Sequence, residues 1–292
     1  MKHQDFDWWP APAKLNLMLK IVGRRQDGYH LLQTVFRFID FSDQLGFKLR
    51  HDGIIRRLSG NESIVESDDL IIRAAQLLQR AAGCAKGVDI ALVKNIPMGG
   101  GLGGGSSDAA TVLVALNHLW GADYPIDKLV SLGLELGADV PVFIQGKAAW
   151  AEGVGEELTP IQLPDAWYVV LVPDCHVSTA EVFRDPQLTR NAPRTTIRDF
   201  LAGRQGNDCL PVVLKHYRQV KEAFDWLALF ASAQLTGTGG CVFAAFESEI
   251  AARHVFMQVP EQFQAFVAQG LDYSPLMQLL SSKQNIGASP SG

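Results

Sequence analysis

A chain of 292 residues can form two domains, and 47% hydrophobic with 20% charged residues is typical of a globular protein with a substantial core. The net charge of −5 argues against a nucleic-acid-binding protein and against a basic membrane-binding surface. No apolar run reaches the length of a membrane span, and the first residues lack the apolar core of a signal peptide, so we expect a cytoplasmic protein without a targeting segment. The four cysteines are scattered without a Cys-x-x-Cys pair, which indicates reduced thiols rather than disulfides, and we expect no protein metal site.

The first predicted strand covers residues 8–21. Its second half alternates apolar residues with Lys14, Asn16 and Lys20, which is the pattern of a half-buried strand. Side chains two residues apart on a strand point to the same face, so Lys14 and Asn16 share one. The alternation alone favours a solvent-facing position for both.

A turn follows at Asp27-Gly28, with Tyr29 and His30 directly after it. Their local pattern alone indicates a packed ring and a surface histidine. Strands are predicted over residues 34–40 and 44–49, an irregular hairpin over 54–66, and a helix that starts at 67–69 and ends at Gly83.

The most informative stretch is residues 97–108, half of which are glycine. A predicted strand over residues 88–96 precedes it, and apolar residues at helical spacing follow it from Ala109. Glycines let backbone N–H groups converge, and the start of the helix adds free donors and partial positive charge. Ser106 and Ser107 can cap that helix or donate a hydroxyl. We interpret the stretch as an anion site, most plausibly for phosphate.

The residues and predicted elements next to this stretch argue against several known classes of phosphate loop. A Walker loop needs Lys after its last glycine, where Ser106 stands. Gly99-x-Gly101-x-x-Gly104 matches the dinucleotide fingerprint, but a helix over residues 126–136 is predicted where a Rossmann unit would continue with a strand. A protein-kinase loop would be followed by a strand that carries the Lys, whereas Lys94 precedes this loop.

The remainder of the chain predicts a second unit. Residues 137–144 indicate a turn into a short apolar strand, and Asp139 at that turn suits an Asx-turn or catalysis equally well. We place a domain boundary between residues 157 and 158, giving units 1–157 and 158–292. The second unit should contain a strand over 167–173, a polar loop over 187–211 that includes Asn207 and Asp208, a helix over 212–230, a second glycine-rich turn over 235–243 and a loose tail over 281–292.

The stretch from Pro97 to Ser107, which we call the glycine loop, resembles the ATP loop of the galactokinase, homoserine kinase, mevalonate kinase and phosphomevalonate kinase superfamily. Separated segments are similar to one family within it, the 4-diphosphocytidyl-2-C-methyl-D-erythritol kinases. The resemblance spans residues 9–275 and rests on the following segments: Pro12-Ala13-Lys14-Leu15-Asn16-Leu17, Asp27-Gly28-Tyr29-His30, the glycine loop, Gly137-Ala138-Asp139-Val140-Pro141, Val177-Ser178-Thr179 with Phe183, and Leu235-Thr236-Gly237-Thr238-Gly239-Gly240.

This resemblance implies a two-domain α+β kinase fold, with an N-terminal ATP domain of mixed sheet and helices and a C-terminal α+β domain. It implies transfer of phosphate from ATP, with Mg²⁺, to the 2-hydroxyl of a cytidylylated sugar alcohol in the non-mevalonate route to isoprenoid precursors. We expect a monomer or weak homodimer without nucleic-acid or membrane partners.

The resemblance also implies roles for individual residues. Lys14 and Asp139 would be the catalytic pair. Tyr29 and Phe183 would stack on the cytosine, His30 would hydrogen-bond it, and Asn16 would contact the erythritol hydroxyls. The residues expected to bind ATP are Pro97, Met98, Gly99, Gly100, Gly101, Leu102, Gly103, Gly104, Gly105, Ser106 and Ser107. Further possible site residues are Lys94, Asp108, Thr179, Gly237, Thr238 and Gly239.

These residue types suit phosphoryl transfer, which depends on positioning and charge stabilisation. A carboxylate at Asp139 could accept the proton of a poorly acidic tertiary alcohol, and Lys14 could hold that carboxylate ionised. Two alternatives stay open at this point. One is another kinase of the superfamily, of the homoserine or mevalonate type, and the other is a nucleotide-dependent oxidoreductase that uses the dinucleotide fingerprint.

Overall fold

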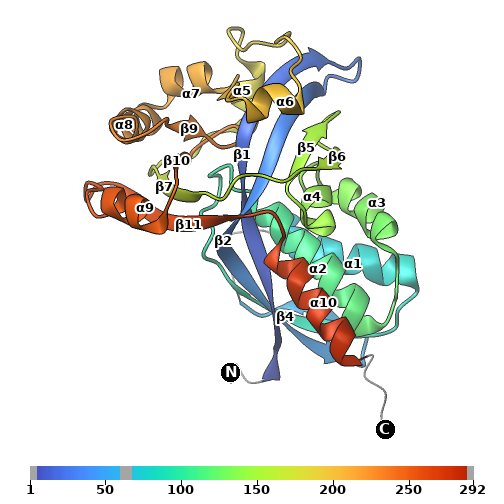
Figure 1. The fold of residues 1–292 in the computed structure, drawn as a ribbon. Coiled ribbons are helices and arrows are strands. Elements are labelled where there is room, and N and C mark those ends of the chain that lie inside the picture. The colour runs from blue at the N-terminus through green and yellow to red at the C-terminus, as the bar shows by residue number, and fades with distance from the viewer. Residues whose placement is uncertain (1–4, 60–67, 288–292) are drawn as a thin grey trace.

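The computed structural model describes residues 5–59 and 68–287, and it forms a mixed sheet with helices on its faces (Figure 1). In the first half of the chain the elements are β1 (Asp7–Arg24), β2 (His30–Arg50), β3 (Ile55–Arg57), α1 (Leu70–Ala82), β4 (Gly87–Val93), α2 (Gly104–Trp120), α3 (Ile126–Leu136), α4 (Val140–Gln145), β5 (Ala149–Glu152) and β6 (Glu157–Pro160). In the second half they are β7 (Trp167–Val172), α5 (Thr179–Arg184), α6 (Ile197–Leu201), β8 (Gly206–Asn207), α7 (Leu210–His216), α8 (Arg218–Leu227), β9 (Gln234–Leu235), β10 (Val242–Phe246), α9 (Glu249–Phe256), β11 (Gln264–Leu271) and α10 (Pro275–Gly287).

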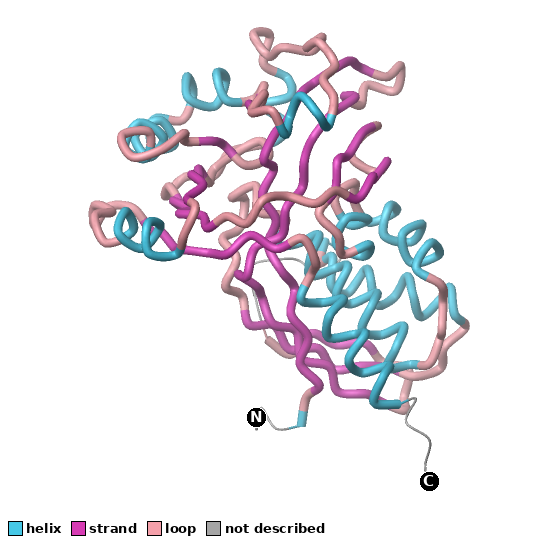
Figure 2. The backbone as a smooth tube through the Cα atoms, viewed as in Figure 1, coloured by secondary structure: helices cyan, strands magenta, loops and turns pink. Residues whose placement is uncertain are grey.

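The long hairpin of β1 and β2 is the frame of the molecule. The two strands pair antiparallel along almost their whole length, and the register shifts near Pro12 and Asn16. At one end β2 also pairs with β4, and farther along it pairs with β11 and β5. Figure 2 shows both strands passing from the half of the molecule that contains α1–α4 and α10 into the half that contains α5–α9. Residues placed along β1 can therefore face elements from either half.

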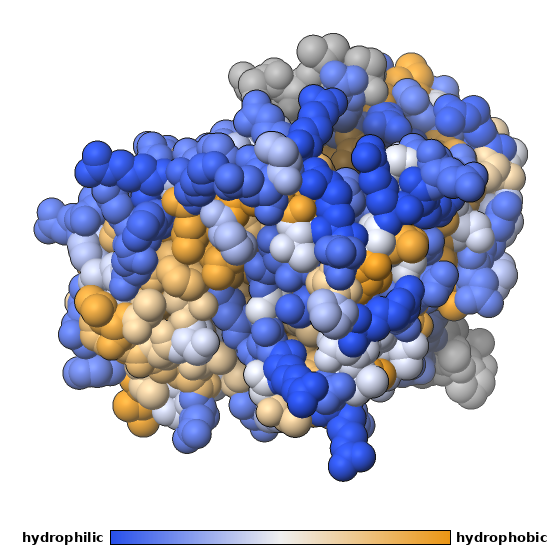
Figure 3. All heavy atoms as spheres, turned by 90° about the horizontal axis from the view of Figure 1, so that it is seen from above, coloured by the Kyte–Doolittle hydropathy of each residue, from blue (hydrophilic) through white to orange (hydrophobic). Residues whose placement is uncertain are grey.

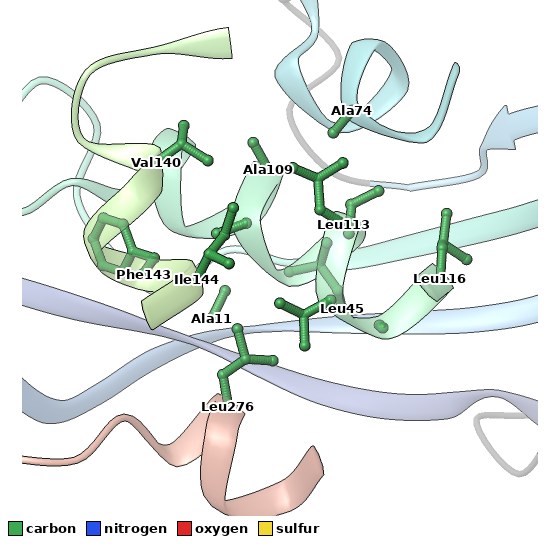
Figure 4. Close-up of a cluster of buried hydrophobic side chains, with 14 of the residues drawn as sticks. Ala11, Leu45, Ala74, Ala109, Leu113, Leu116, Val140, Phe143, Ile144 and Leu276 are labelled. Atoms are coloured by element: carbon green, nitrogen blue, oxygen red, sulfur yellow. The ribbon is translucent and has the colours of Figure 1, made fainter. Parts of the chain in front are cut away.

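The first core lies between the sheet and the helices α1, α2, α3, α4 and α10. Helix α2 is at its centre, and most of its side chains are buried on every face. Figure 4 shows side chains from β1, β2, α2, α4 and α10 converging there, among them Ala11, Leu45, Ala109, Leu113, Phe143, Ile144 and Leu276. Because α2 is packed from all sides, its first turn is held in a fixed position.

The second core lies between β7, β9 and β10 and the helices α7, α8 and α9. Strand β11 joins the two halves, because it pairs with β7 along most of its length and with β2 at its end. Figure 3, seen from above Figure 1, shows hydrophobic residues gathered on the left, over the helices of this half. Exposed apolar side chains of these helices and their flanks include Leu229, Ile250 and Met257. No described helix has both the length and the apolar character needed to cross a membrane.

Most predicted elements of the first half are confirmed, including the helix over residues 126–136, the strand before the glycine loop and Gly83 as the end of α1. Two predicted strands are wrong as separate elements, since residues 34–40 and 44–49 belong to the single strand β2. The polar residues between them pair with β1, and the Asp43 carboxylate accepts backbone hydrogen bonds from Asn95 and Ile96. Part of the predicted hairpin over 54–66 lies outside the described residues, and its described part forms β3.

The predicted strand at residues 137–144 is wrong, because the apolar run from Val140 forms helix α4. A short apolar run does not by itself distinguish a strand from a buried helix, and Pro141 at the first turn is compatible with a helix start. The predicted tail over 281–292 is also wrong in its described part. Helix α10 continues through it, and Lys283 pairs with Asp7 at 2.8 Å.

Two smaller differences lie in the second half. The single helix predicted over residues 212–230 is two helices, α7 and α8, which meet at Tyr217 in an extended conformation. Asn207 was expected in a loop but lies in the short strand β8, which pairs with β1.

The boundary between residues 157 and 158 stays a prediction. Helix α10, from the end of the chain, packs on β1 and α2 of the first half.

A buried charge cluster joins the sheet to α2 beside the glycine loop. The Lys94 ammonium lies 2.5 Å from the Asp43 carboxylate and 2.8 Å from that of Asp108. Asp43 and Asp108 are both buried, at 0% and 4% exposure. Burial raises the pKa of Asp108 to about 7, against the opposing effect of Lys94 and with a further contribution from Asp43. One lysine therefore balances two carboxylates, of which Asp108 titrates near neutral pH.

Asp108→Asn should make stability less dependent on pH. The folded pKa of about 7 lies above the ordinary carboxyl value of 3.8, so between these values the folded protein binds this proton more tightly than the unfolded chain does. The wild-type free energy of unfolding therefore falls as the pH rises through that window. Relative to Asp108→Asn, we expect the wild type to lose on the order of a few kcal/mol between about pH 5 and about pH 8, at about 1.4 kcal/mol per pKa unit.

Urea unfolding at the two pH values measures this difference. Asp225→Asn is the matched control, because Asp225 is an exposed carboxylate on α8 that also pairs with a lysine. Its effect on the free energy of unfolding should be small and equal at both pH values. An equal pH dependence in the wild type and in Asp108→Asn would contradict the assignment of a raised pKa to this group.

Candidate active site

A cleft of about 1170 Å³ runs along one side of the β1–β2 hairpin. The glycine loop and the start of α2 line it from the first half, and α5 with the second glycine-rich loop (residues 235–241) lines it from the second half. Of the residues predicted to bind ATP, those from Pro97 to Ser106 line the cleft, whereas Ser107 is fully buried and does not. The other predicted site residues that line it are Lys14, Asn16, Tyr29, His30, Lys94, Asp108, Asp139, Thr179, Phe183, Gly237 and Thr238. Gly239 does not line it.

The glycine loop ends in a helix start that no side chain caps. Helix α2 begins at Gly104, and its N-cap is Gly103 in the left-handed conformation, so neither serine is the cap. A Cβ at Gly103 would lie 2.7 Å from the Phe143 ring and 3.0 Å from Cε of Lys14. Glycine is therefore required here by both conformation and packing. The first N–H groups of α2 are left for another acceptor, which is the arrangement of an anion site.

Lys14 and Asp139 lie together in the cleft, as the family resemblance implies. Lys14 is only 2% exposed, which corrects the expectation from strand alternation that it faces solvent. Its ammonium donates to Asn16 Oδ1 at 2.6 Å and to the Gly101 carbonyl at 2.9 Å, and it lies 3.4 Å from Asp139 Oδ2. The β1 register shifts on both sides of this residue, and its side chain packs over the Phe36 ring.

Asp139 is the half-exposed member of this pair, with 37% of its side chain accessible. It stands at the N-cap position of α4, but its side chain makes no capping hydrogen bond. The capping role that the sequence leaves open is thus not what the carboxylate does. Its oxygens are available to a group in the cleft.

Asn16 lines the cleft, but its amide is already engaged. Its oxygen accepts from Lys14, and its Nδ2 donates to Thr34 Oγ1 at 2.8 Å. The Thr34 hydroxyl in turn donates to the Met18 carbonyl. This arrangement orients the amide so that its oxygen faces the ammonium. A contact with a substrate hydroxyl stays a prediction, and the hydrogen bonds support a role in holding Lys14.

The far end of the cleft contains a pair of stacked rings. His30 and Phe183 lie 4.8 Å apart between ring centroids with planes 22° apart, and Tyr29 is 64% exposed beside them. Burial, followed by the charges of Arg190 and Arg24, lowers the pKa of His30 below its ordinary value. Within the described residues its buried Nε2 has no hydrogen-bond partner. A neutral imidazole with a free nitrogen suits recognition of an uncharged polar ring.

Several other residues around the cleft hold its walls together. Thr179 and Thr238 hydrogen-bond to each other at 2.8 Å and so connect α5 to the second glycine-rich loop. Asp69 caps α1 by accepting from Ile71 N at 2.9 Å. A Cβ on Gly239 would contact Leu235 and Val213 of the second core, so this glycine faces that core and not the cleft.

Sequence reasoning missed four residues here. Thr34 and Thr236 hold the network around Lys14, and Arg24 and Arg184 line the cleft. Arg24 could have been noticed from its place beside the Asp27-Gly28 turn, and Thr236 from its place in the second glycine-rich segment. Thr34 has no local signal, because its role depends on strand pairing with β1. Over the described ranges, no group of three or more His, Cys, Asp or Glu residues is placed to hold a metal ion.

Comparisons with known proteins agree with this geometry. Residues 69–147 match the model of the N-terminal domain of GHMP kinases, and residues 193–265 match that of the C-terminal domain. A 4-diphosphocytidyl-2-C-methyl-D-erythritol kinase of Alkalilimnicola ehrlichii is 55% identical over 277 residues, which are 95% of each chain. The enzyme of that name from Nitrosococcus oceani is 54% identical over 272 residues, covering 93% of this chain and 97% of its own.

A solved structure of a 4-(cytidine 5'-diphospho)-2C-methyl-D-erythritol kinase has the same fold, with a TM-score of 0.79 at 33% identity, and the match covers 90% of this chain and 99% of that one. The two-domain α+β kinase fold expected from the sequence is thereby confirmed, and the kinase prediction is favoured over the oxidoreductase alternative. This chain belongs to the GHMP kinases and, within them, to the family of 4-diphosphocytidyl-2-C-methyl-D-erythritol kinases.

Proposed function

We propose that this protein transfers the γ-phosphoryl group of ATP to the 2-hydroxyl of 4-diphosphocytidyl-2-C-methyl-D-erythritol. The observation that carries the proposal is the Lys14–Asp139 pair, which lies in one cleft together with an uncapped helix start and a stacked ring pair. A phosphate donor and a nucleotide-bearing acceptor could meet at this pair. The sequence identity to the named relatives supports the same substrates.

The glycine loop is the proposed ATP end of the cleft. The free N–H groups at the start of α2 would bind phosphate oxygens, and the helix dipole would add to that attraction. ATP normally carries Mg²⁺, which needs few protein ligands when phosphates supply the rest. The described residues gather no carboxylate cage for such an ion, so we assign no step to it.

Transfer would take place between Asp139 and Lys14. The hydroxyl oxygen of the acceptor forms a bond to the γ-phosphorus as the bond to the bridging oxygen of ADP breaks. The Asp139 carboxylate accepts the hydroxyl proton, and the Lys14 ammonium offsets negative charge on the transferred group. Because Lys14 is held by two further oxygens, its ammonium is already positioned before the substrates bind.

The stacked rings form the proposed cytidine end. Phe183 is fixed through its carbonyl, which accepts from the Arg190 guanidinium at 2.8 Å. A cytosine could stack beside the His30–Phe183 pair, with Tyr29 closing over it, and His30 Nε2 is free to hydrogen-bond the base. A homoserine or mevalonate kinase would have no use for this feature, which is why we prefer the cytidylylated acceptor.

The cellular setting follows from the proposed reaction. We expect a cytoplasmic enzyme of the non-mevalonate route to isoprenoid precursors, as a monomer or weak homodimer.

ADP production from ATP should be measured with the cytidylylated substrate, homoserine and mevalonate in parallel. Turnover should be confined to the first of these. Comparable turnover with homoserine or mevalonate would overturn the proposed acceptor.

Asp139→Asn should lower kcat by roughly two to four orders of magnitude, the usual contribution of a general base. The amide keeps the size of the side chain but can neither accept the proton nor carry the charge. Both KM values should change little, since the glycine loop and the ring pair supply the binding. Steady-state kinetics, normalised to the folded fraction from circular dichroism, measure the effect.

The control is Asp127→Asn, which removes an exposed carboxylate in the first turn of α3. It should retain wild-type turnover. A folded Asp139→Asn enzyme with normal kcat would end the assignment of this carboxylate as the base.

Phe183→Ala should raise the KM for the cytidylylated substrate by the equivalent of roughly 1–3 kcal/mol, which is typical for the loss of one base-stacking ring. The stacking contact exists in both the ground state and the transition state, so kcat should change little. The KM for ATP should be unaffected. His30→Ala should act in the same direction, because it removes the ring partner and the free nitrogen.

Phe256→Ala is the matched control, because it removes a partly exposed ring on the outer helix α9. If Phe183→Ala, His30→Ala and this control all leave the KM for the cytidylylated substrate unchanged, the cytosine site must be placed elsewhere.

A further inference from the structure

The second glycine-rich loop, residues 235–241, packs backbone to backbone against the first. The N–H of Cys241 donates to the Gly100 carbonyl at 3.0 Å. A Cβ on Gly101 would lie only 2.2 Å from the Thr236 carbonyl oxygen. Two segments far apart in the sequence therefore approach each other as closely as glycine permits. The second loop belongs to the half of the chain that does not carry Lys14 or the first glycine loop.

Thr236 makes the polar contacts of this junction. It is 0% exposed and does not line the cleft. Its hydroxyl accepts from the Asn16 backbone N–H at 3.1 Å and donates to the Gly101 carbonyl at 3.0 Å. A hydroxyl has one proton to donate and lone pairs to accept, so both bonds form at once. The same hydroxyl thus fixes β1 two residues beyond Lys14 and also fixes the glycine loop.

The Gly101 carbonyl is also an anchor of the Lys14 ammonium, at 2.9 Å. Its oxygen has two lone pairs, and in this arrangement Thr236 and Lys14 occupy both. The other anchor, Asn16 Oδ1, belongs to the residue whose N–H Thr236 accepts. Besides Asp139, the ammonium thus has two oxygen partners, and one buried hydroxyl bonds to both residues that supply them. Thr236 bonds directly to the Gly101 carbonyl and to the backbone of Asn16, whose side-chain amide is oriented by Thr34.

We propose that Thr236 is a positioning residue, whose hydroxyl holds the Lys14 ammonium at the place of phosphoryl transfer through Gly101 and Asn16. This inference rests on the proposed function for the role of Lys14, but the placement of the ammonium can be tested without substrate. Without the hydroxyl, the Asn16 N–H loses this acceptor and the Gly101 carbonyl loses one of its two hydrogen bonds. The ammonium then has a less defined position relative to Asp139.

The variants that test this are Thr236→Val, which keeps the shape and removes the hydroxyl, and Thr236→Ser, which keeps the hydroxyl. Thr236→Val should lower kcat per folded molecule by about ten- to a hundredfold, as expected for a small misplacement of a catalytic group, with nearly unchanged KM values. Thr236→Ser should restore most of the turnover. Thr111→Val is the control, since Thr111 is an equally buried hydroxyl that donates to the Pro10 carbonyl from α2, and it should leave kcat unchanged.

A second comparison separates positioning from a general loss of stability. If Thr236 acts through Lys14, then Thr236→Val should have almost no further effect on kcat in a Lys14→Ala background. The same fold-loss in both backgrounds would overturn the proposal, and so would a wild-type kcat in folded Thr236→Val.

The third readout needs no substrate. The ammonium resonance of Lys14, identified by its absence in Lys14→Ala, should be observable in nitrogen-15 spectra of the wild type and of Thr236→Ser, because the group is buried and hydrogen-bonded. It should broaden or disappear in Thr236→Val. An unchanged resonance in Thr236→Val contradicts the proposal. If the wild type does not phosphorylate the cytidylylated substrate, the proposed function fails while this measurement still decides the role of Thr236.

Discussion

The burial of one positive charge, the Lys14 ammonium, constrains the arrangement of this active site. A buried charge is costly unless it is paired and hydrogen-bonded. Here the oxygens that meet this need come from Asn16 on β1, from Gly101 in the glycine loop and from Asp139 at the start of α4. Satisfying the ammonium therefore requires three separate segments to converge. The same convergence places a half-exposed carboxylate, a cation and an uncapped helix start in one cleft.

The charged groups around the cleft differ in whether they are free to interact with a bound molecule. Lys94 also lines it, but its ammonium is held between Asp43 and Asp108 and serves to join β2, the end of β4 and α2. Among the described residues, Lys14 pairs with one carboxylate, that of Asp139, which is half exposed. At the other end, His30 is kept neutral by burial and by nearby arginines, which lower its pKa. The cleft thus combines a lysine–carboxylate pair at one place with a neutral imidazole and aromatic rings at another.

The sequence predicts the parts of this site that depend on local chemistry. The glycine loop, the strand before it and the helix after it follow from composition and periodicity. A helix start is predicted at residues 67–69, and the structure has Asp69 as the cap of α1. The burial of Lys14 and Asn16 could not be predicted. Alternation on a strand shows which residues share a face, but it does not show whether other elements cover that face. The same limit explains α4, where an apolar run reads as a strand until its packing against α2 is known. Thr34 acts only through the pairing of β1 with β2, so no local pattern marks it. The second glycine-rich segment draws attention to Thr236, but the contacts of this residue with Asn16 and Gly101 cannot be predicted from that segment.

The central claim is that Lys14 and Asp139 act as one unit on the transferred phosphoryl group. The most direct test is a double-mutant cycle of kcat with Lys14→Ala, Asp139→Asn and the double variant, each normalised to its folded fraction. If the pair acts as a unit, the double variant loses far less than the product of the two single losses, and its turnover lies close to that of the worse single variant. Independent losses that multiply in the double variant would contradict the account.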